Sequence, residues 1–252
     1  MKHFLWLLTL WLSTVYAAQA QKITVLTYNI HHGANEQGRL NLIRVGQLIR
    51  EHKPDLVALQ ELDSATTRSY GGYQMQQLAN LTGMYPLFGK AIDLEAGAYG
   101  IGILSKYPIL ASQNIPLPNP DSTEQRVILC AYVELPNQKT IRFCNTHLDH
   151  QSRLNRGMQL AMVNQMLRVS IQPVIWAGDL NARPDEPGIQ PIWNEWQDAG
   201  VRSKTPTLPH GNARIDYILT RRQSKFTLLK YEVLKEPDTS DHQPVLATYL
   251  LK

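Results

Sequence analysis

The 252-residue sequence has little excess charge, almost no cysteine and no internal repeat. Its 25 basic and 21 acidic side chains leave a formal net charge of +4, far below the charge density of a dedicated nucleic-acid binder. Only two cysteines are present, which disfavours a structural zinc site built from thiolates. Beyond residue 20, no apolar run approaches the roughly 20 residues that a membrane-spanning helix needs. No low-complexity tract or linker divides the sequence, and this favours one folded domain.

The first 20 residues form a separate segment with the features of a secretory signal peptide. Lys2 gives a basic start, residues 4–12 are apolar, and residues 18–20 supply the small side chains of a cleavage site. The stretch 4–18 contains Ser13 and Thr14 and is short for a bilayer span, which argues against an uncleaved anchor. We therefore expect cleavage before Gln21, a monomeric mature chain of residues 21–252, and a location in the periplasm or outside the cell.

The remaining sequence alternates between strand-like and helix-like segments. With 43% hydrophobic residues, it can bury a large core. Runs of β-branched residues predict strands, and apolar residues at helical spacing predict helices. The expected strands cover residues 22–30, 55–63, 99–110, 126–135, 139–147, 172–180, 214–220, 226–235 and 242–250, and the expected helices cover 42–52, 73–83, 151–170 and 189–198. This pattern predicts a mixed sheet system covered by helices.

In the expected helix 151–170, four apolar residues recur every four positions. They are Leu154, Met158, Met162 and Met166. A methionine stripe of this kind is far more often core packing than a functional surface. We expect these side chains to face the core.

Two expected strands, residues 126–135 and 139–147, form a predicted hairpin. If the turn between them is a three-residue loop, Leu135 pairs with Lys139 and Cys130 lies directly opposite Cys144. A loop one residue longer or shorter would change the register and separate the thiols. The sequence leaves two possibilities open, a disulfide, which an exported protein permits, or two buried free cysteines.

Polar side chains interrupt the apolar strands at similar places. In WAGDLNARP, residues 176–184, Asp179 and Asn181 stand two apart and therefore face the same side at a strand end. A single polar residue there is ordinarily a turn cap, but strand ends gathered at one rim would bring several into one cleft. The other residues at or just past an expected strand end are Asn29, Glu61, His147, Asp216, Asp241 and His242. Together they predict an active site.

The residue types limit the chemistry of this predicted site. Carboxylates and amides favour a hard divalent cation such as Mg²⁺ or Mn²⁺, because such ions prefer oxygen ligands. Histidines beside the metal can transfer protons and stabilise charge near neutral pH. A metal, a carboxylate that positions water and imidazoles that stabilise oxyanions are together what phosphoester hydrolysis requires.

The sequence as a whole resembles the endonuclease/exonuclease/phosphatase superfamily. The motifs TYNI, LQE, YGIGILSK, NTHLDH, GDLNARP, RIDYIL and SDHQPV occur in that order across the mature chain. The resemblance implies an α/β (α+β) fold, a four-layer α/β/β/α sandwich in which two mainly antiparallel sheets pack face to face with helices outside. It also implies Mg²⁺-dependent cleavage of phosphoester bonds by in-line attack of water, with Mn²⁺ as an alternative ion.

The resemblance also assigns roles to residues of these motifs. Asp179 is implied to orient or deprotonate the attacking water, and Asn181 to hold the scissile phosphate. His242 is implied to pair with Asp216 and, together with His147, to contact the phosphate oxygens as charge builds in the transition state.

The implied metal ligands lie in the motifs TYNI, LQE and SDHQPV. Glu61 is the implied principal ligand, with Asn29 beside it, and Asp241 is a further ligand or supports one. Gly100 is followed by Ile101, where family members often carry Asn, so Tyr99 is the remaining polar candidate for substrate binding at that point.

Several further residues lie beside matched positions. Asp149 and Arg183 are expected to bind substrate, while His31, His32 and His150 are equally consistent with contact to substrate and with a solvated loop.

The loops around the cleft decide the substrate, because the fold serves many phosphoesters. Segments such as TYNIHHG, TGMYPLFGKAI and AYGIGILSKYPI are more similar to bacterial proteins akin to the glycolipid-anchor remodelling branch than to DNA-repair nucleases. We therefore expect a phospholipid headgroup or another small phosphoester. The alternative is a secreted nonspecific nuclease, for which Arg153, Arg156, Arg183 and Arg202 are candidate contacts to DNA or RNA. A non-catalytic binding protein is disfavoured because the catalytic set is complete.

Overall fold

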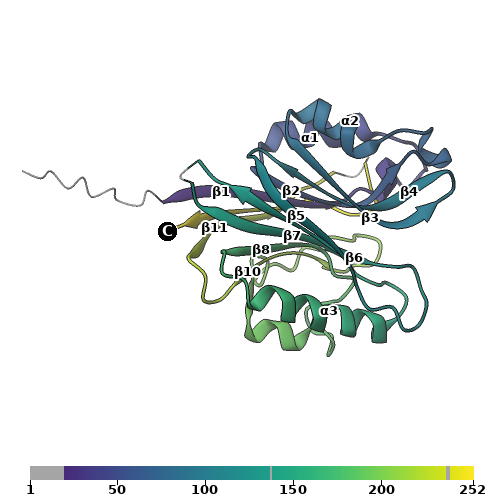
Figure 1. Cartoon of the computed structure of the whole chain (residues 1–252). Coiled ribbons are helices and arrows are strands. Elements are labelled where there is room, and N and C mark those ends of the chain that lie inside the picture. The colour runs from purple at the N-terminus through teal and green to yellow at the C-terminus, as the bar shows by residue number, and fades with distance from the viewer. Residues whose placement is uncertain (1–19, 137, 237–238) are drawn as a thin grey trace, which may run out of the picture.

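Two six-stranded sheets form the centre of the protein in a computed structural model, which describes residues 20–136, 138–236 and 239–252 (Figure 1). The expected signal peptide lies outside the described residues, except for Ala20. The first sheet has the order β11-β12-β1-β2-β4-β3 and the second the order β5-β6-β7-β8-β10-β9. The first contains β1 (Gln21–Asn29), β2 (Leu56–Ser64), β3 (Tyr85–Leu94), β4 (Gly97–Ser105), β11 (Phe226–Val233) and β12 (Val245–Leu251). The second contains β5 (Ile109–Pro116), β6 (Val127–Glu134), β7 (Thr140–His147), β8 (Val174–Asp179), β9 (Trp196–Asp198) and β10 (Asp216–Arg221).

Each sheet has one parallel pair at its centre and is otherwise antiparallel. β1 pairs in parallel with β2, and β7 pairs in parallel with β8. Each parallel pair brings the carboxyl ends of its two strands side by side in the middle of its sheet. The other pairings of the described strands are antiparallel.

Helices cover the outer face of each sheet (Figure 1). α1 (Leu42–His52) and α2 (Gln74–Thr82) pack on the first sheet, and α3 (Arg153–Arg168) and the 3₁₀ helix η3 (Gln190–Asn194) pack on the second. Separate apolar clusters fill the space between the sheets and the space beneath each helical layer. Each fully buried Val, Leu or Ile contributes roughly 1.5–3 kcal/mol. The layers confirm the expected four-layer sandwich of two mainly antiparallel sheets with outer helices. No helix within the described ranges has the length and apolarity to cross a bilayer.

The ends of α1 and α2 follow from backbone signals in the sequence. Lys53 adopts a left-handed conformation with a φ of 48°, its amide donates to the Ile49 carbonyl, and Pro54 cannot continue the helix. Gly83 ends α2 with a φ of 71°, a conformation in which glycine has no side-chain penalty. Both helix ends agree with the sequence prediction.

The predicted helix at residues 189–198 is wrong. Only Gln190–Asn194 form a short 3₁₀ helix, and β9 then pairs antiparallel with β10 at the edge of the second sheet. Trp196 is fully buried and packs edge-to-face on Trp176, with ring centroids 5.4 Å apart. This tertiary contact favours the extended backbone over the local helical pattern.

The predicted packing of the methionine stripe on α3 is also wrong in part. Leu154 and Met158 are 56% and 44% exposed, whereas Met162 and Met166 are partly buried at the edge of the cluster. Positions four apart rotate by about 40° per step around a helix of 3.6 residues per turn, so four of them cannot share one face. The side chains that pack on the second sheet are Leu160, Val163 and Leu167.

The hairpin of β6 and β7 has the register that places its cysteines opposite each other. The Leu135 amide donates to the Lys139 carbonyl at 2.9 Å, and the Cα atoms of Cys130 and Cys144 are 4.1 Å apart. The two residues form a disulfide, so the structure selects this possibility over two free thiols. The bridge lies in the apolar layer beneath α3.

Candidate active site

Polar residues from the centre of both sheets meet at one rim. Asn29 ends β1, His147 ends β7 and Asp179 ends β8, as expected. Asp216 instead begins β10, and Asp241 and His242 lie just before β12, so the prediction that these residues follow a strand's carboxyl end is wrong for all three. Because β10 runs antiparallel to β8 and β12 to β1, the starts of these strands reach the same rim.

Glu61 lies within β2, at a β-bulge rather than at the strand end. The pairing of β2 with β4 shifts between Leu59 and Leu62, and Glu61 has a φ of 58°, in the left-handed region. Asn29 Nδ2 donates to Glu61 Oε1 at 2.9 Å. A bulge that changes the direction of one side chain is common beside active sites.

A buried amide from the opposite sheet satisfies backbone groups near this bulge. Asn145 on β7 donates Nδ2 to the carbonyls of Leu59 and Gly102, each at 2.8 Å, and accepts from Gln60 Nε2 at 2.7 Å. Asn145 is two residues from His147, and Gln60 is next to Glu61. These bonds therefore fix Glu61, on the first sheet, relative to His147, on the second.

Asp179 lies between the two halves and is 1% exposed. Its Oδ1 accepts from the Asn181 amide at 2.8 Å, and its Oδ2 accepts from Asn29 Nδ2 at 3.2 Å. Burial and the neighbouring Asp216 raise the pKa of Asp179, which makes its carboxylate a stronger base than an ordinary aspartate. Asn29 thus connects Glu61 and Asp179 across the two sheets.

The GDLN motif depends on unusual backbone geometry. Gly178 has a φ of 144°, and a Cβ at this position would lie 2.0 Å from the Thr146 carbonyl oxygen, so only glycine permits this approach of β8 to β7. Asn181 has a φ of 48°, and its Nδ2 donates to the Leu148 carbonyl at 3.0 Å. Such non-glycine conformations cost on the order of 1–3 kcal/mol and concentrate at functional sites.

His242 is paired with a buried carboxylate. Its Nδ1 lies 2.9 Å from Asp216 Oδ2, and its Nε2 lies 3.8 Å from Asp179 Oδ2. Burial lowers the pKa of His242, but Asp216 and then Asp179 more than offset this effect and raise the pKa to about 10. His242 is therefore a cation at neutral pH and directs an Nε2–H toward Asp179.

His147 lies on the other side of Asp179, with its Nε2 3.6 Å from Asp179 Oδ2. Its Nδ1 lies 3.2 Å from a terminal nitrogen of Arg126, which is buried. Because a guanidinium only donates, Nδ1 accepts and the single proton of the neutral ring is on Nε2. Burial, and after it the charge of Arg126, lowers the pKa of His147 well below its ordinary value. Both histidines thus present an Nε2–H, one from a neutral ring and one from a cation.

We expect Arg126 to be a positioning residue for His147. The Arg126→Met variant lacks the donor to Nδ1 and should give a mixture of His147 tautomers, whereas the natural protein should show the Nε2–H form alone. ¹⁵N NMR of the imidazole nitrogens distinguishes these forms. Arg126→Lys, which keeps a donor and the charge, should retain more of the Nε2–H form. Identical His147 signals in the natural protein and Arg126→Met would show that another group holds the ring.

Sequence reasoning missed Arg126, although a signal for it was present. The hairpin register with Leu135 opposite Lys139 places His147 opposite Val127, the residue next to Arg126. A charged residue at the start of an otherwise apolar strand, next to a candidate catalytic histidine, could have identified it. Arg126 also contacts His150. The second terminal nitrogen of the Arg126 guanidinium lies 3.1 Å from His150 Nδ1.

A cavity of about 410 Å³ opens in front of Asp179. Glu61, Asn181, His147, His242 and Asp241 line it. Asn29 and Asp216 lie behind this lining and are 1% exposed.

Tyr99 and Arg68 form another wall of the same cavity. Arg68, in the 3₁₀ helix η2 (Thr67–Ser69), donates to both carboxylate oxygens of the buried Asp63 at 2.7 Å, and its guanidinium lies 5.4 Å from the centre of the Tyr99 ring. Tyr99, which the sequence suggests as a substrate contact, thus lines the cavity. Sequence reasoning missed Arg68, and its loop carries no pattern that marks it.

Two expected substrate-binding residues do not line the cavity. Asp149 is 2% exposed and accepts from the amides of Gln151 and Ser152 at 2.7 and 2.8 Å. Arg183 is exposed and donates to the carbonyls of residues 211 and 212 at 2.8 and 2.9 Å. In the structure each of these side chains holds a loop, because its polar atoms are directed at neighbouring backbone.

Two groups of side chains in the described chain could hold a divalent cation. Glu61 forms one with His31 and His32, and the other combines Asp179, Asp216 and His242. In the second group two of the potential ligands are already paired with each other, because His242 Nδ1 lies 2.9 Å from Asp216 Oδ2. Glu61 is thus the better metal ligand, and the Asn29 amide oxygen lies beside it. Asp241 lines the same cavity but belongs to neither group.

Comparison with known proteins links the chain to one family and to structures of the same fold. A family model described as Endonuclease/Exonuclease/phosphatase family matches residues 26–242. Protein cwh43 of Schizosaccharomyces pombe is 26% identical over 167 residues, which are 66% of this chain but only 17% of the length of that protein.

Two solved structures illustrate the likeness in fold. An endonuclease/exonuclease/phosphatase from Beutenbergia cavernae has 24% identity and a TM-score of 0.78, and the match covers 91% of this chain and 72% of that one. A mannosyl-6-phosphatase from Bacteroides thetaiotaomicron has 17% identity and a TM-score of 0.75, with 90% and 99% covered. At these identities the likeness shows a shared fold.

Proposed function

Because the chain belongs to the endonuclease/exonuclease/phosphatase family, we propose that it is a divalent-cation-dependent hydrolase of small phosphoesters, with a phospholipid headgroup as one candidate substrate. The observation that carries the proposal is the arrangement around Asp179. This buried carboxylate faces the Nε2 atoms of His147 and His242 at 3.6 and 3.8 Å. The arrangement supplies a base for water and two N–H donors for a phosphate.

In the proposed reaction, Asp179 accepts a proton from the attacking water as the water oxygen bonds to phosphorus. The bond from phosphorus to the leaving oxygen breaks in line with this attack. His242, as a cation, and His147, through its Nε2–H, donate to phosphate oxygens as negative charge builds on them. Asn181 lies beside Asp179 and orients the phosphate. A divalent cation held by Glu61 and Asn29 would withdraw charge from the phosphate oxygens.

The size and walls of the cavity support a small substrate over a nucleic acid. None of the four arginines suggested for nucleic-acid contact lines it, and the two other arginines that do, Arg68 and Arg126, are engaged with Asp63 and His147. Arg156 is buried, and its guanidinium donates to the Asp149 carbonyl at 2.7 Å and to Glu186 at 3.4 Å. Arg183 is engaged with backbone carbonyls. A neighbour in fold is named a mannosyl-6-phosphatase, which is consistent with a compact phosphoester in this fold.

The test is a panel of phosphoesters assayed with Mg²⁺ or Mn²⁺ and again with EDTA. The panel contains 4-nitrophenyl phosphate, bis(4-nitrophenyl) phosphate, glycerophosphocholine and supercoiled plasmid DNA. We expect hydrolysis of at least one small ester, its loss with EDTA, and plasmid that stays supercoiled. Cation-dependent nicking of the plasmid would favour the nuclease alternative, and a lack of hydrolysis across the panel would contradict the proposed activity.

A further inference from the structure

We propose that His31 and His32 bind the same divalent cation as Glu61, and that this nitrogen-containing site selects a transition ion such as Mn²⁺, Co²⁺ or Zn²⁺ over Mg²⁺. The proposal takes from the proposed function only the presence of a cation at Glu61. One potential ligand atom from each of the three side chains lies within 4.8 Å of the other two. Small side-chain rotations would bring such atoms to the spacing of ligands around one ion.

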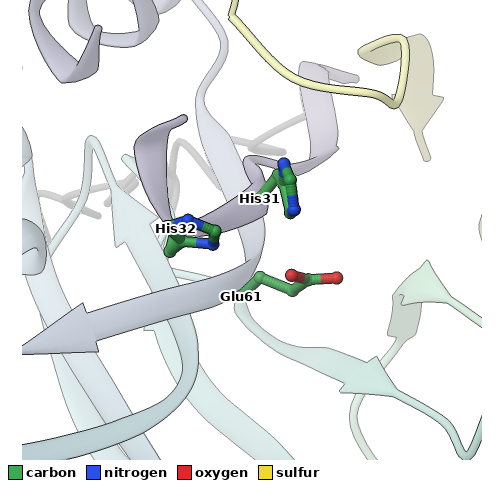
Figure 2. A group of neighbouring side chains, drawn as sticks. All are labelled: His31, His32 and Glu61. Carbon is green, nitrogen blue, oxygen red and sulfur yellow. The ribbon is translucent and has the colours of Figure 1, made fainter. Parts of the chain in front are cut away.

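The local backbone directs the three side chains toward one another. β1 is followed by the 3₁₀ helix η1 (His31–Gly33), and Glu61 projects from the bulge of β2. His31, His32 and Glu61 all have left-handed φ angles, of 46°, 45° and 58°. Figure 2 shows the His31 ring next to the Glu61 carboxylate, with the His32 ring beside them. The centres of the two rings are 4.5 Å apart.

A buried nitrogen in this group has no partner. His31 Nδ1 is inaccessible to solvent, and no hydrogen-bond partner for it occurs among the described residues. Buried polar atoms are normally paired, so an exception calls for an explanation such as a bound ion. The His31 amide already donates to Asn29 Oδ1 at 3.1 Å, which holds η1 against the residue beside Glu61. A cation coordinated by this nitrogen would supply the missing partner.

The donor set determines the class of ion. Mg²⁺ takes oxygen ligands and water, whereas imidazole nitrogen suits transition ions. Two histidines and one glutamate are also the protein ligands of one type of catalytic zinc site. A site at Glu61 with oxygen donors alone would not discriminate in this way. The two histidines therefore predict a preference that an oxygen-only site lacks.

Binding of Mn²⁺ to the purified protein tests the proposal without any assay of activity. In the natural protein, electron spin echo envelope modulation of bound Mn²⁺ should show coupling to directly bound imidazole nitrogen. His31→Asn and His32→Asn should each weaken Mn²⁺ binding by about tenfold or more, measured from the signal of free Mn²⁺, and should change Mg²⁺ affinity far less. Asparagine is the chosen replacement because it tolerates left-handed φ angles. His52→Asn, at the exposed end of α1, is the matched control.

Each outcome of this experiment is decisive. Bound Mn²⁺ without nitrogen coupling, and with affinity unchanged in both variants, would overturn the histidine ligation. Cation-dependent hydrolysis measured separately could still stand in that case, so the proposed function would survive. Natural protein that binds neither Mn²⁺ nor Mg²⁺ and hydrolyses no phosphoester would overturn both proposals.

Discussion

Replacing Asp179 by Asn is expected to lower kcat for phosphoester hydrolysis by about 10³-fold, with little change in KM. Asparagine has nearly the same shape and keeps an oxygen for the Asn181 amide, but it cannot accept a proton from water. Because the carboxylate acts on the attacking water, the loss falls on the chemical step. The measurement is steady-state kinetics on the best small ester of the panel.

The stability of the same variant separates a catalytic role from a structural one. The natural carboxylate is 1% exposed and lies beside Asp216, and burial and Asp216 both disfavour its charge. Asp179→Asn removes that buried charge, so its free energy of unfolding should be within about 1 kcal/mol of the natural value, or higher. Asp185→Asn, at an exposed position, should leave both quantities unchanged. An Asp179→Asn variant with a tenth or more of natural kcat would place the base elsewhere.

Replacing Asp149 by Ala is expected to lower the free energy of unfolding by about 3 kcal/mol. Its carboxylate accepts from the Gln151 and Ser152 amides, from Asn155 Nδ2 at 3.0 Å and from Thr123 Oγ1. Removal of this one group leaves four donors to be satisfied by water in the space between β7 and α3. Urea unfolding at neutral pH measures the effect.

The stabilisation from Asp149 should also disappear in acid. Burial alone would raise its pKa, but the hydrogen bonds from Thr123, the Ser152 amide and Asn155 lower it from 3.8 to about 2. Because the folded pKa lies below the unfolded one, the stabilisation is complete above about pH 4 and is lost as the pH falls toward about 2. The difference in stability between the natural protein and Asp149→Asn should shrink over that range. A difference that does not vary with pH would assign the loss to packing, and Asp185→Asn should follow the natural protein throughout.

The fold was predictable where a segment's local pattern and its tertiary surroundings agree. The strand β1, with its β-branched residues, and the stop at Gly83 follow from residue type, whereas the hairpin register is one of the alternatives that the sequence left open. β3 was not predicted, because Pro86 and Gly89 weaken its strand pattern, and only its position at the edge of the first sheet tolerates them. Residues 189–198 show the opposite case. Their local pattern predicted a helix, but the contact of the buried Trp196 ring with Trp176 favours the strand β9.

The candidate site was predictable as a set of residues but not as a geometry. The sequence indicates that Glu61 and Asp179 belong together, yet it contains no sign of the bulge that directs Glu61 toward Asn29. A bulge depends on the pairing of two strands, here β2 and β4, and on no single residue. Asp149 was expected to bind substrate because of its sequence position near His147. That position does not reveal the four donors that surround its carboxylate.

The hydrogen bonds of the site join distant parts of the chain. Asn29 donates to Asp179 across 150 positions, and Ser240 Oγ donates to the Asn29 carbonyl across 211. During synthesis β1 leaves the ribosome long before its neighbour β12, and although Glu61 follows Asn29 closely, Asp179 and Ser240 are synthesised much later. A nascent or truncated chain therefore cannot assemble the reactive arrangement, and competence for catalysis arises only with the closure of both sheets. Synthesis itself thus delays the hydrolase until folding is finished.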